Sequence, residues 1–315
     1  MVDFNALLSR LPGRPNLRDR EGLVAALDRL PVAREAATPF VAGESVADAV
    51  AAVAETRAAG MDACLEYLPQ PGAEASARLV HLQLITALGD ADLAEGCDLL
   101  VDPTAIGVGR SDDAAVVTEL GALCEAAAAA GMTATLAPLP AGLLDRGLAV
   151  RAAVAEAQPR FGLTLAAQLQ RSEGDCLDLA AAGARVRLVR TGPPPSPGDT
   201  AFHKGHDIDL SYVRCLRILI EGGARTTVAT HDPRLLEIAR AIASRSEASG
   251  DATNFQFRRG VLPERAAELV AAGSPVSTLV PFGPGWARYV STRLALKPSS
   301  VGQALRAASG RGEAS

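Results

Sequence analysis

Aromatic residues and cysteines are scarce in this chain. Tryptophan, tyrosine and phenylalanine make up 3% of the 315 residues, whereas 48% of the residues are hydrophobic. The core must therefore be built mainly from alanine, valine and leucine. The five cysteines are odd in number and show no Cys-x-x-Cys spacing, which argues against disulfides or zinc and favours buried thiols in a reducing cytoplasm. They are Cys64, Cys97, Cys124, Cys176 and Cys215.

An excess of positive charge and a long apolar run are also missing. The formal net charge is −5 and the two signs are interspersed, so nothing suggests binding to nucleic acid or to a membrane surface. No apolar run reaches the roughly 20 residues that span a bilayer. The segment Met1–Arg10 contains an acidic residue and lacks the apolar stretch of a signal peptide. We expect a cytoplasmic protein.

Short apolar runs alternate with alanine- and leucine-rich helical segments after residue 60. Eight strand–helix units in about 250 residues are typical of a (β/α)8 barrel of the TIM type, whose strands are apolar on both faces. An open, doubly wound sheet is the alternative, although it usually has fewer units. The predicted strands are Met61–Leu68, Asp98–Val101, Thr133–Ala137, Phe161–Leu169, Val186–Arg190, Thr226–Thr230, Asn254–Phe257 and Val276–Val280. The predicted helices are Ala73–Leu88, Asp112–Ala130, Ala141–Ala157, Asp175–Ala182, Leu210–Gly222, Pro233–Ser246, Pro263–Ala272 and Gly285–Ala295.

Residues 1–60 show no strand pattern and precede the barrel. We expect helices at Asp3–Leu11, Arg18–Leu30 and Ser45–Ala59, with Ser45 as the N-cap of the last. The predicted organisation is an N-terminal helical extension over residues 1–60 that packs on the barrel, the barrel over 61–308, and a disordered tail over 309–315. The longest irregular segment is Thr191–Ile208, and a loop of that length is usually functional or disordered.

The segment Arg225–Pro233 places polar residues at the end of a buried strand. Its β-branched first half favours a strand, and Pro233 suits the first turn of the following helix. In α/β folds, ligands bind where strands end. An N-cap requires only one residue, and we assign that role to Asp232. Thr230 and His231 are then candidates for a binding site.

Arg187 stands in an otherwise apolar strand. A buried guanidinium needs an acceptor, which can be a carboxylate inside the barrel or an anionic ligand, and we favour the ligand. Other strands end in Asp102 and Gln168, whereas Arg258 and Arg259, taken singly, are expected to be solvated.

The segment His203–Asp209 contains residue types that bind metals. Nothing in the sequence holds them on one rigid element, so we favour a solvated loop over a metal site. Asp207 and Asp209 are expected to include the N-cap of the next helix. Gly107 and Gly109 form a bare Gly-x-Gly, which we interpret as a turn.

The strand ends also form a recognisable set. In chain order they are Phe40–Glu44, Arg185–Arg190, Ala229–Asp232, Phe255–Gly260, Val280–Gly283 with Trp286, Tyr289 and Arg293, and Pro298. This set resembles the monofunctional bacterial proline dehydrogenases from about residue 40 to about residue 305, in the family's order and spacing. The resemblance implies a distorted (β/α)8 barrel that binds FAD at the C-terminal ends of its strands. It also implies oxidation of L-proline to 1-pyrroline-5-carboxylate.

The resemblance gives four residues a role. The family's arginine that lies against the flavin corresponds to Arg187, and its Thr-His pair on the adenylate side of FAD corresponds to Thr230 and His231. One arginine of the pair that grips the proline carboxylate corresponds to Arg293. These groups supply charge-assisted and hydroxyl contacts of the kind that flavin, phosphate and carboxylate require.

The chain departs from the family pattern on the substrate side. Asp102 stands where the family has a lysine on the second strand, which reverses a charge beside the expected carboxylate. Ala137 stands where the family has an aspartate on the third strand, and Ala166 where it has a glutamine on the fourth. Leu279 replaces a tyrosine of the pocket. Thr292 replaces the other arginine of the pair, and Leu296 replaces the acid that follows it. The tyrosine after strand five and the last strand-seven aromatic correspond to Pro193 and Arg259.

The retained residues favour FAD-dependent oxidation of L-proline, or of a related cyclic amine, in proline catabolism. The electron acceptor would be a quinone or another acceptor, with the membrane surface as one location for it. The altered residues favour the alternative, a degenerate family member without proline dehydrogenase activity that binds FAD, another anion or a partner protein. A third hypothesis is a changed substrate whose cationic group meets Asp102. We adopt the first as the working hypothesis.

Overall fold

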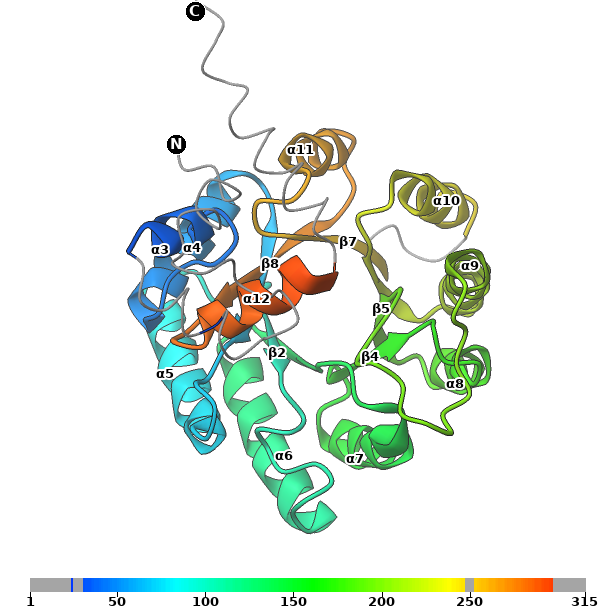
Figure 1. Ribbon diagram of the computed structural model, residues 1–315, viewed down its shortest axis with the longest axis horizontal. Helices are drawn as coiled ribbons and strands as arrows, with labels where there is room; N and C mark the ends of the chain where they lie inside the picture. Colours follow the sequence, from blue (N-terminus) through cyan, green and yellow to red (C-terminus); the bar gives the residue numbers. More distant parts are fainter. Residues whose placement is uncertain (1–23, 25–30, 247–251, 297–315) are drawn as a thin grey trace, which may run out of the picture.

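The computed structural model describes residues 24, 31–246 and 252–296. Eight parallel strands form a closed barrel in the order β1 to β8, and β8 pairs with β1 from Asp62 opposite Ser277 to Tyr67 opposite Phe282. This closure confirms the predicted (β/α)8 barrel and excludes the open, doubly wound sheet. The helices surround the strands (Figure 1). Apart from residue 24, the predicted helices within residues 1–30 lie outside the described residues, as does the predicted tail.

The strands begin or end within three residues of their predicted bounds. They are β1 (Asp62–Tyr67), β2 (Asp98–Val101), β3 (Thr133–Leu136), β4 (Gly162–Ala166), β5 (Arg185–Val189), β6 (Arg225–Ala229), β7 (Thr253–Arg258) and β8 (Val276–Phe282). The α-helices are α3 (Pro31–Ala37), α4 (Val46–Ala58), α5 (Ala77–Asp90), α6 (Asp113–Ala129), α7 (Leu144–Ala157), α8 (Ser172–Ala181), α9 (Gly205–Glu221), α10 (Pro233–Ala243), α11 (Pro263–Ala271) and α12 (Trp286–Leu296), and short 3-10 turns precede α5 and α7.

The helix α9 begins five residues earlier than the sequence predicted. Lys204 occupies its N-cap position without a side-chain cap, so the expectation that Asp207 and Asp209 include the N-cap is wrong. Asp207 lies in the first turn, where a carboxylate interacts favourably with the helix dipole. Asp209 accepts a hydrogen bond from Nε of Arg190 at 2.5 Å. Because α9 begins at Gly205, part of the predicted loop belongs to the helix.

Local capping sets the start of two other helices as predicted. Ser45 forms a capping box with Asp48 at the start of α4, in which each side chain bonds the backbone of the other residue. Asp232 caps α10 by accepting from the backbone N–H groups of Arg234 and Leu235, with Pro233 in the first turn.

The barrel lumen contains a buried ion pair. Asp98 on β2 accepts from Nη1 of Arg185 on β5 at 2.8 Å and from the hydroxyl groups of Thr133 and Thr135 on β3. Beside it, Cys64, Leu100 and Leu279 pack together with Ala137 as a small apolar cluster. The guanidinium and the two hydroxyl groups satisfy the carboxylate of Asp98, which makes burial of its charge tolerable.

Candidate functional site at the C-terminal mouth of the barrel

Arg187 on β5 points into the barrel and is 6% exposed. Its Nε donates a hydrogen bond of 2.6 Å to Oε1 of Gln256 on β7. Among the described residues, this neutral amide is the only hydrogen-bond partner of the guanidinium, whereas Arg185, two residues earlier, has the carboxylate of Asp98. The ion pair inside the barrel that the sequence allowed for Arg187 is thus formed by Arg185 instead. The charge of Arg187 remains available for an anionic group.

The end of β6 holds Thr230 and His231 in fixed positions. The hydroxyl of Thr230, a residue that is 5% exposed, accepts a hydrogen bond from the backbone N–H of Asp232 at 3.2 Å. Nε2 of His231 accepts from the backbone N–H of Arg258 at 2.9 Å, and its ring stands edge-on to Phe257 with the ring centroids 6.0 Å apart. Because Nε2 accepts a hydrogen bond, a neutral His231 carries its proton on Nδ1.

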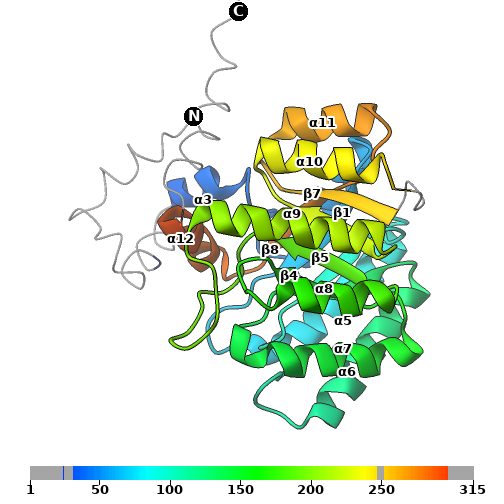
Figure 2. The ribbon, with the colours of Figure 1, turned by 90° about the vertical axis from the view of Figure 1, so that its right-hand side faces the viewer.

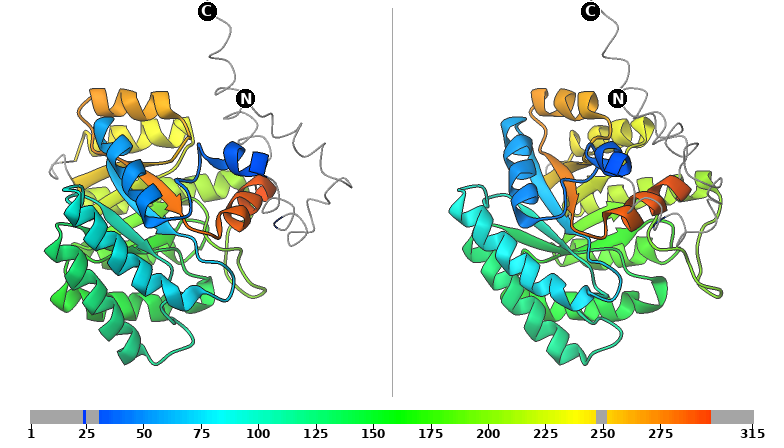
Figure 3. Two further views of the ribbon diagram at one scale, coloured as in Figure 1. Left: turned by 90° about the vertical axis from the view of Figure 1, so that its left-hand side faces the viewer. Right: turned by 60° about the vertical axis from the view of Figure 1, so that its left-hand side comes forward.

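The helix α12 lies across the mouth. It follows β8 after only three residues, and Figures 1 and 2 show it across one end of the barrel, beside α3. The views of Figure 3 show the same neighbourhood of α3 in blue and α12 in red. The face of α12 that meets the barrel is buried through Trp286, Ala287, Val290 and Ser291.

Arg293 belongs to α12, so its backbone is at the same end of the barrel as the ends of β5 and β6. The elements that carry Arg187, Thr230, His231 and Arg293 thus converge on one rim. The position of the Arg293 side chain lies outside what the structure describes.

Two glycines allow the close approach that places α12. A Cβ atom on Gly285 would lie 2.3 Å from the carbonyl oxygen of Pro69, and one on Gly283, whose φ is +127°, would lie 2.5 Å from that of Leu68. The backbone N–H of Gly285 donates to the carbonyl of Leu68 at 2.8 Å. The connection from β8 to α12 is therefore attached to the segment that follows β1.

Known proteins resemble this chain in sequence and in architecture. No family model matches the chain. It is 25% identical to proline dehydrogenase 1 of Bacillus subtilis over 277 residues, which cover 87% of this chain and 90% of that protein. It is 30% identical to the proline dehydrogenase of Deinococcus radiodurans over 140 residues, about 44% of this chain and 45% of that protein. The chain is therefore similar to the proline dehydrogenases over most of its length.

Solved structures share the fold of this chain. Proline utilization A (PutA) of Bdellovibrio bacteriovorus, inactivated by N-propargylglycine, superposes with a TM-score of 0.74 and 18% identity over 85% of this chain. PutA of Bradyrhizobium japonicum superposes with a TM-score of 0.69 and 19% identity over 95% of this chain. The chain spans about a third of each PutA chain, 33% and 34% respectively.

Asp102 departs from the family pattern, and the structure gives it a local role. It follows β2 directly, and its Oδ1 accepts from both the backbone N–H and the hydroxyl of Thr104, at 2.8 and 2.7 Å. This arrangement is an Asx turn, which folds the chain back after a strand. The carboxylate is half-buried at the rim. A structural role for the turn and a role in binding a cation are therefore compatible at this residue.

The segment after β5 covers the ends of β3 and β4. A Cβ atom on Gly192 would lie 3.0 Å from Cβ of Ala166 and 3.5 Å from Cβ of Pro138. Nε2 of Gln168 donates to the carbonyl of Pro193 at 2.8 Å. The small Ala166 side chain, where the resemblance places a glutamine, therefore leaves room for this backbone.

Two of the arginines that could replace a missing positive charge are already paired. Arg190 binds Asp209, as described above, and Nη2 of Arg259 lies 2.8 Å from Oε2 of Glu55 on α4. Arg259 is thus not simply solvated, because it connects the end of β7 to α4. Neither of these arginines therefore replaces the positive charge that is lost where Asp102 stands in place of the family's lysine.

Three polar residues near the mouth were missed by the sequence analysis. Gln256 accepts the hydrogen bond of Arg187. The sequence feature that could have identified it is an amide side chain within an otherwise apolar strand. Glu66 on β1 has a buried Oε2 atom without a hydrogen-bond partner among the described residues. His81 on α5 is 2% exposed, and neither ring nitrogen has such a partner in the described part of the chain. Its signal was a polar residue in the buried series of α5, with Ala77, Leu84 and Leu88.

Proposed function

We propose that this protein is an FAD-dependent flavoprotein that oxidises L-proline, or a related cyclic amine, to 1-pyrroline-5-carboxylate in proline catabolism. The likeness to a proline dehydrogenase over 90% of that protein's length is the observation that carries the proposal. The buried Arg187, whose bound partner is a neutral amide, supports it, because a flavin ring presents polar acceptor atoms to such a group.

The residues at the mouth fit a flavin. Thr164 on β4 stands opposite Arg187 in the strand register, and its buried hydroxyl has no hydrogen-bond partner in the described residues. An unsatisfied hydroxyl and a guanidinium without a carboxylate together call for a polar ligand. Arg187 would hold the ring system, and Thr230 and His231 would hold the adenylate side.

The chemistry divides between cofactor and protein. When bound, FAD supplies the acceptor for the hydride that leaves the substrate. Arg187 would orient the ligand through a guanidinium that is held by Gln256. The buried face of α12 excludes water from the mouth, which strengthens every electrostatic contact inside it. Arg293 on this helix would bind the substrate carboxylate.

The remaining parts of the proposal concern location and electron flow. The reduced cofactor would pass its electrons to a quinone or another acceptor, with the membrane surface as one place for that reaction. Within the described residues, no helix has both the length and the apolar composition required to cross a bilayer. The scattered buried thiols support a cytoplasmic location.

Two measurements on the purified protein test the proposal. We expect a flavin absorption band in the visible spectrum and, under anaerobic conditions, reduction of an artificial electron acceptor when proline is added. Arg187→Met should lose the bound flavin, whereas Arg217→Met, which removes an exposed arginine that pairs with Glu221 on α9, should keep it. A colourless protein that takes up no added FAD would rule out the flavoprotein.

The departures on the substrate side favour a second candidate, a family member that binds FAD or another anion without oxidising proline. Its specific support is Asp102, which places a negative charge at the rim where the resemblance has a lysine. A protein that holds FAD but fails to reduce it with proline would establish this candidate. Asp102→Lys would then be expected to restore measurable proline binding, because it removes a repulsion and adds a cation.

A further inference from the structure

A polar cavity of about 310 Å³ opens at the opposite end of the barrel from the mouth. Residues at the N-terminal ends of the strands line it, among them Asp98, Thr133 and Arg185, and it extends inward to Gln256. A volume of this size corresponds to roughly ten water molecules at about 30 Å³ each. The cavity is thus large enough for a small ligand together with water.

The charged side chains around the cavity leave a positive excess. Each lining carboxylate already has an arginine partner: Asp98 binds Arg185 at 2.8 Å, and Asp62 binds Arg57 at 2.5 Å. Arg160 and Arg225 also line the cavity, at its exposed rim, and neither has a carboxylate partner among the described residues. Two guanidinium groups therefore remain to bind an anion.

The inner wall of the cavity offers a hydrogen-bond acceptor. Oδ1 of Asn254 is buried and has no hydrogen-bond partner in the residues that the structure describes. The amide group of Asn254 is already used, because Nδ2 donates to the hydroxyl of Ser277 at 2.7 Å. A buried acceptor without a donor is rare in folded proteins and indicates a bound donor group.

We propose that this cavity is a binding site for a small oxyanion that still carries a proton, of the hydrogen-phosphate type. Arg160 and Arg225 bind the negative oxygens, and Oδ1 of Asn254 accepts a hydrogen bond from the P–OH group. Sulfate at neutral pH presents the same shape and charge without that donor, so the site discriminates against it. This site opens away from the mouth, approaches it only through Gln256, and does not depend on the proposed function.

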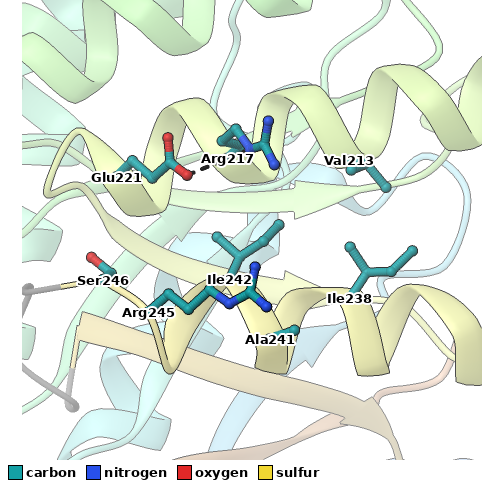
Figure 4. A pocket seen from close by; sticks show the side chains of 8 residues that line it. All are labelled: Val213, Arg217, Glu221, Ile238, Ala241, Ile242, Arg245 and Ser246. Atoms are coloured by element: carbon teal, nitrogen blue, oxygen red, sulfur yellow. Dashed lines mark ion pairs between the residues drawn. The ribbon is translucent and has the colours of Figure 1, made fainter.

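The cavity differs from a second hollow of the surface, which lies between α9 and α10 (Figure 4). That hollow has a volume of about 230 Å³ and is lined by apolar side chains such as Val213 and Ile238. Its Arg217 is paired with Glu221 at 3.4 Å. Arg245 also lines it, but none of the lining side chains has a buried polar atom without a partner among the described residues, and nothing in the structure indicates what would cover the hollow.

Calorimetric titration with inorganic phosphate, and with sulfate at matched ionic strength, tests the site on the full-length protein. We expect phosphate to bind at one site per chain and sulfate to bind about tenfold more weakly, because sulfate lacks the donor of one hydrogen bond. The double variant Arg160→Gln/Arg225→Gln should lose phosphate binding, and because both side chains are exposed, it should fold normally. Arg217→Gln, which is exposed and remote from the cavity, should bind phosphate like the unaltered protein.

The variant Asn254→Leu tests the acceptor separately. It should bind phosphate and sulfate with similar weak affinity, because it keeps both arginines and lacks Oδ1. Absence of phosphate binding by the unaltered protein would overturn the proposal. Equal binding of the two anions, or unchanged binding by the double arginine variant, would do the same.

Discussion

His81 is held in the core of the protein in its neutral form. Burial lowers the pKa of this imidazole to about 4, and the nearby charge of Asp102 acts weakly in the opposite direction. The side chain packs edge-on against Tyr67, with ring centroids 6.2 Å apart. In an unfolded chain the same group titrates at about 6.5, so the unfolded state binds the proton first as the pH falls.

The first prediction concerns pH and His81. Because its folded pKa is lowered, the free energy of unfolding should fall as the pH drops from about 6.5 to about 4, by on the order of 3 kcal/mol. His81→Leu should remove this part of the pH dependence, and denaturant titrations at a series of pH values measure it. The control His203→Gln changes an exposed histidine and should keep the slope. An unchanged slope in His81→Leu would contradict the structure.

The second prediction concerns the N-cap of α10. The pKa of Asp232 lies below its usual range because of the hydrogen bond from the Arg234 side chain, assisted by the backbone N–H groups of Arg234 and Leu235. Asp232→Ala should lower the free energy of unfolding at pH 7 by about 1 kcal/mol, the usual value of such a cap. A carboxylate whose pKa is lower in the folded state stabilises the fold at pH values above its pKa in the unfolded chain. The difference in stability between the variant and the unaltered protein should therefore vanish as the pH falls below about 4. A difference that persists at pH 2 would argue against the cap.

At the scale of an element, the position of α12 depends on the short connection from β8. Gly283 and Gly285 pass so close to the carbonyl groups of Leu68 and Pro69 that no side chain fits. The same connection is hydrogen-bonded to the segment before α4, because the N–H of Gly283 donates to the carbonyl of Gly43 at 2.9 Å. The covering helix, the end of β1 and the segment before α4 are therefore joined at one corner of the mouth.

The third prediction follows from this corner. Gly285→Ala should lower the free energy of unfolding by about 1–3 kcal/mol, the usual range for an overpacked site, and should expose α12 to limited proteolysis. Gly174→Ala in α8 is the matched control, because a Cβ atom there meets nothing within 4 Å. It should instead stabilise the protein by up to about 1 kcal/mol. Equal behaviour of the two variants would show that the close approach is not required.

At the scale of the whole molecule, the barrel and its helices enclose all five thiols. Each cysteine is free and buried, which confirms the sequence prediction of buried thiols. Burial raises the pKa of Cys124 to about 12 and that of Cys64 well above its ordinary value. A protonated, inaccessible thiol reacts slowly with any electrophile.

The fourth prediction is that folded protein shows no rapidly reacting thiol. Titration of the folded protein with a disulfide reagent should detect no thiol within the first minutes. After unfolding in denaturant it should detect five thiols per chain, in agreement with the sequence. The variant Leu177→Cys, at a position that is 58% exposed, should add one immediate equivalent and show that the reagent is active. A fast thiol in the unaltered protein would mean that a helix leaves the barrel in the native state.

Sequence alone determined the features that depend on neighbours along the chain. The alternation of apolar runs and helical segments gave the eight strands, and the caps at Ser45 and Asp232 follow from residues within three or four positions. The pattern misplaced the start of α9, because the ion pair between Arg190 and Asp209 joins residues nineteen positions apart. It also marked Arg187, Thr230 and His231 as polar groups at or near strand ends.

Only the tertiary structure decided which groups meet. The partner of Arg187 is Gln256, 69 residues away, and the ion pair within the barrel joins Asp98 to Arg185, 87 residues apart. Such contacts depend on closure of β8 onto β1 and on which side chains the strand register turns into the lumen. A periodic pattern shows that a side chain is buried, but its partner is set by the three-dimensional arrangement of strands that are distant in the chain.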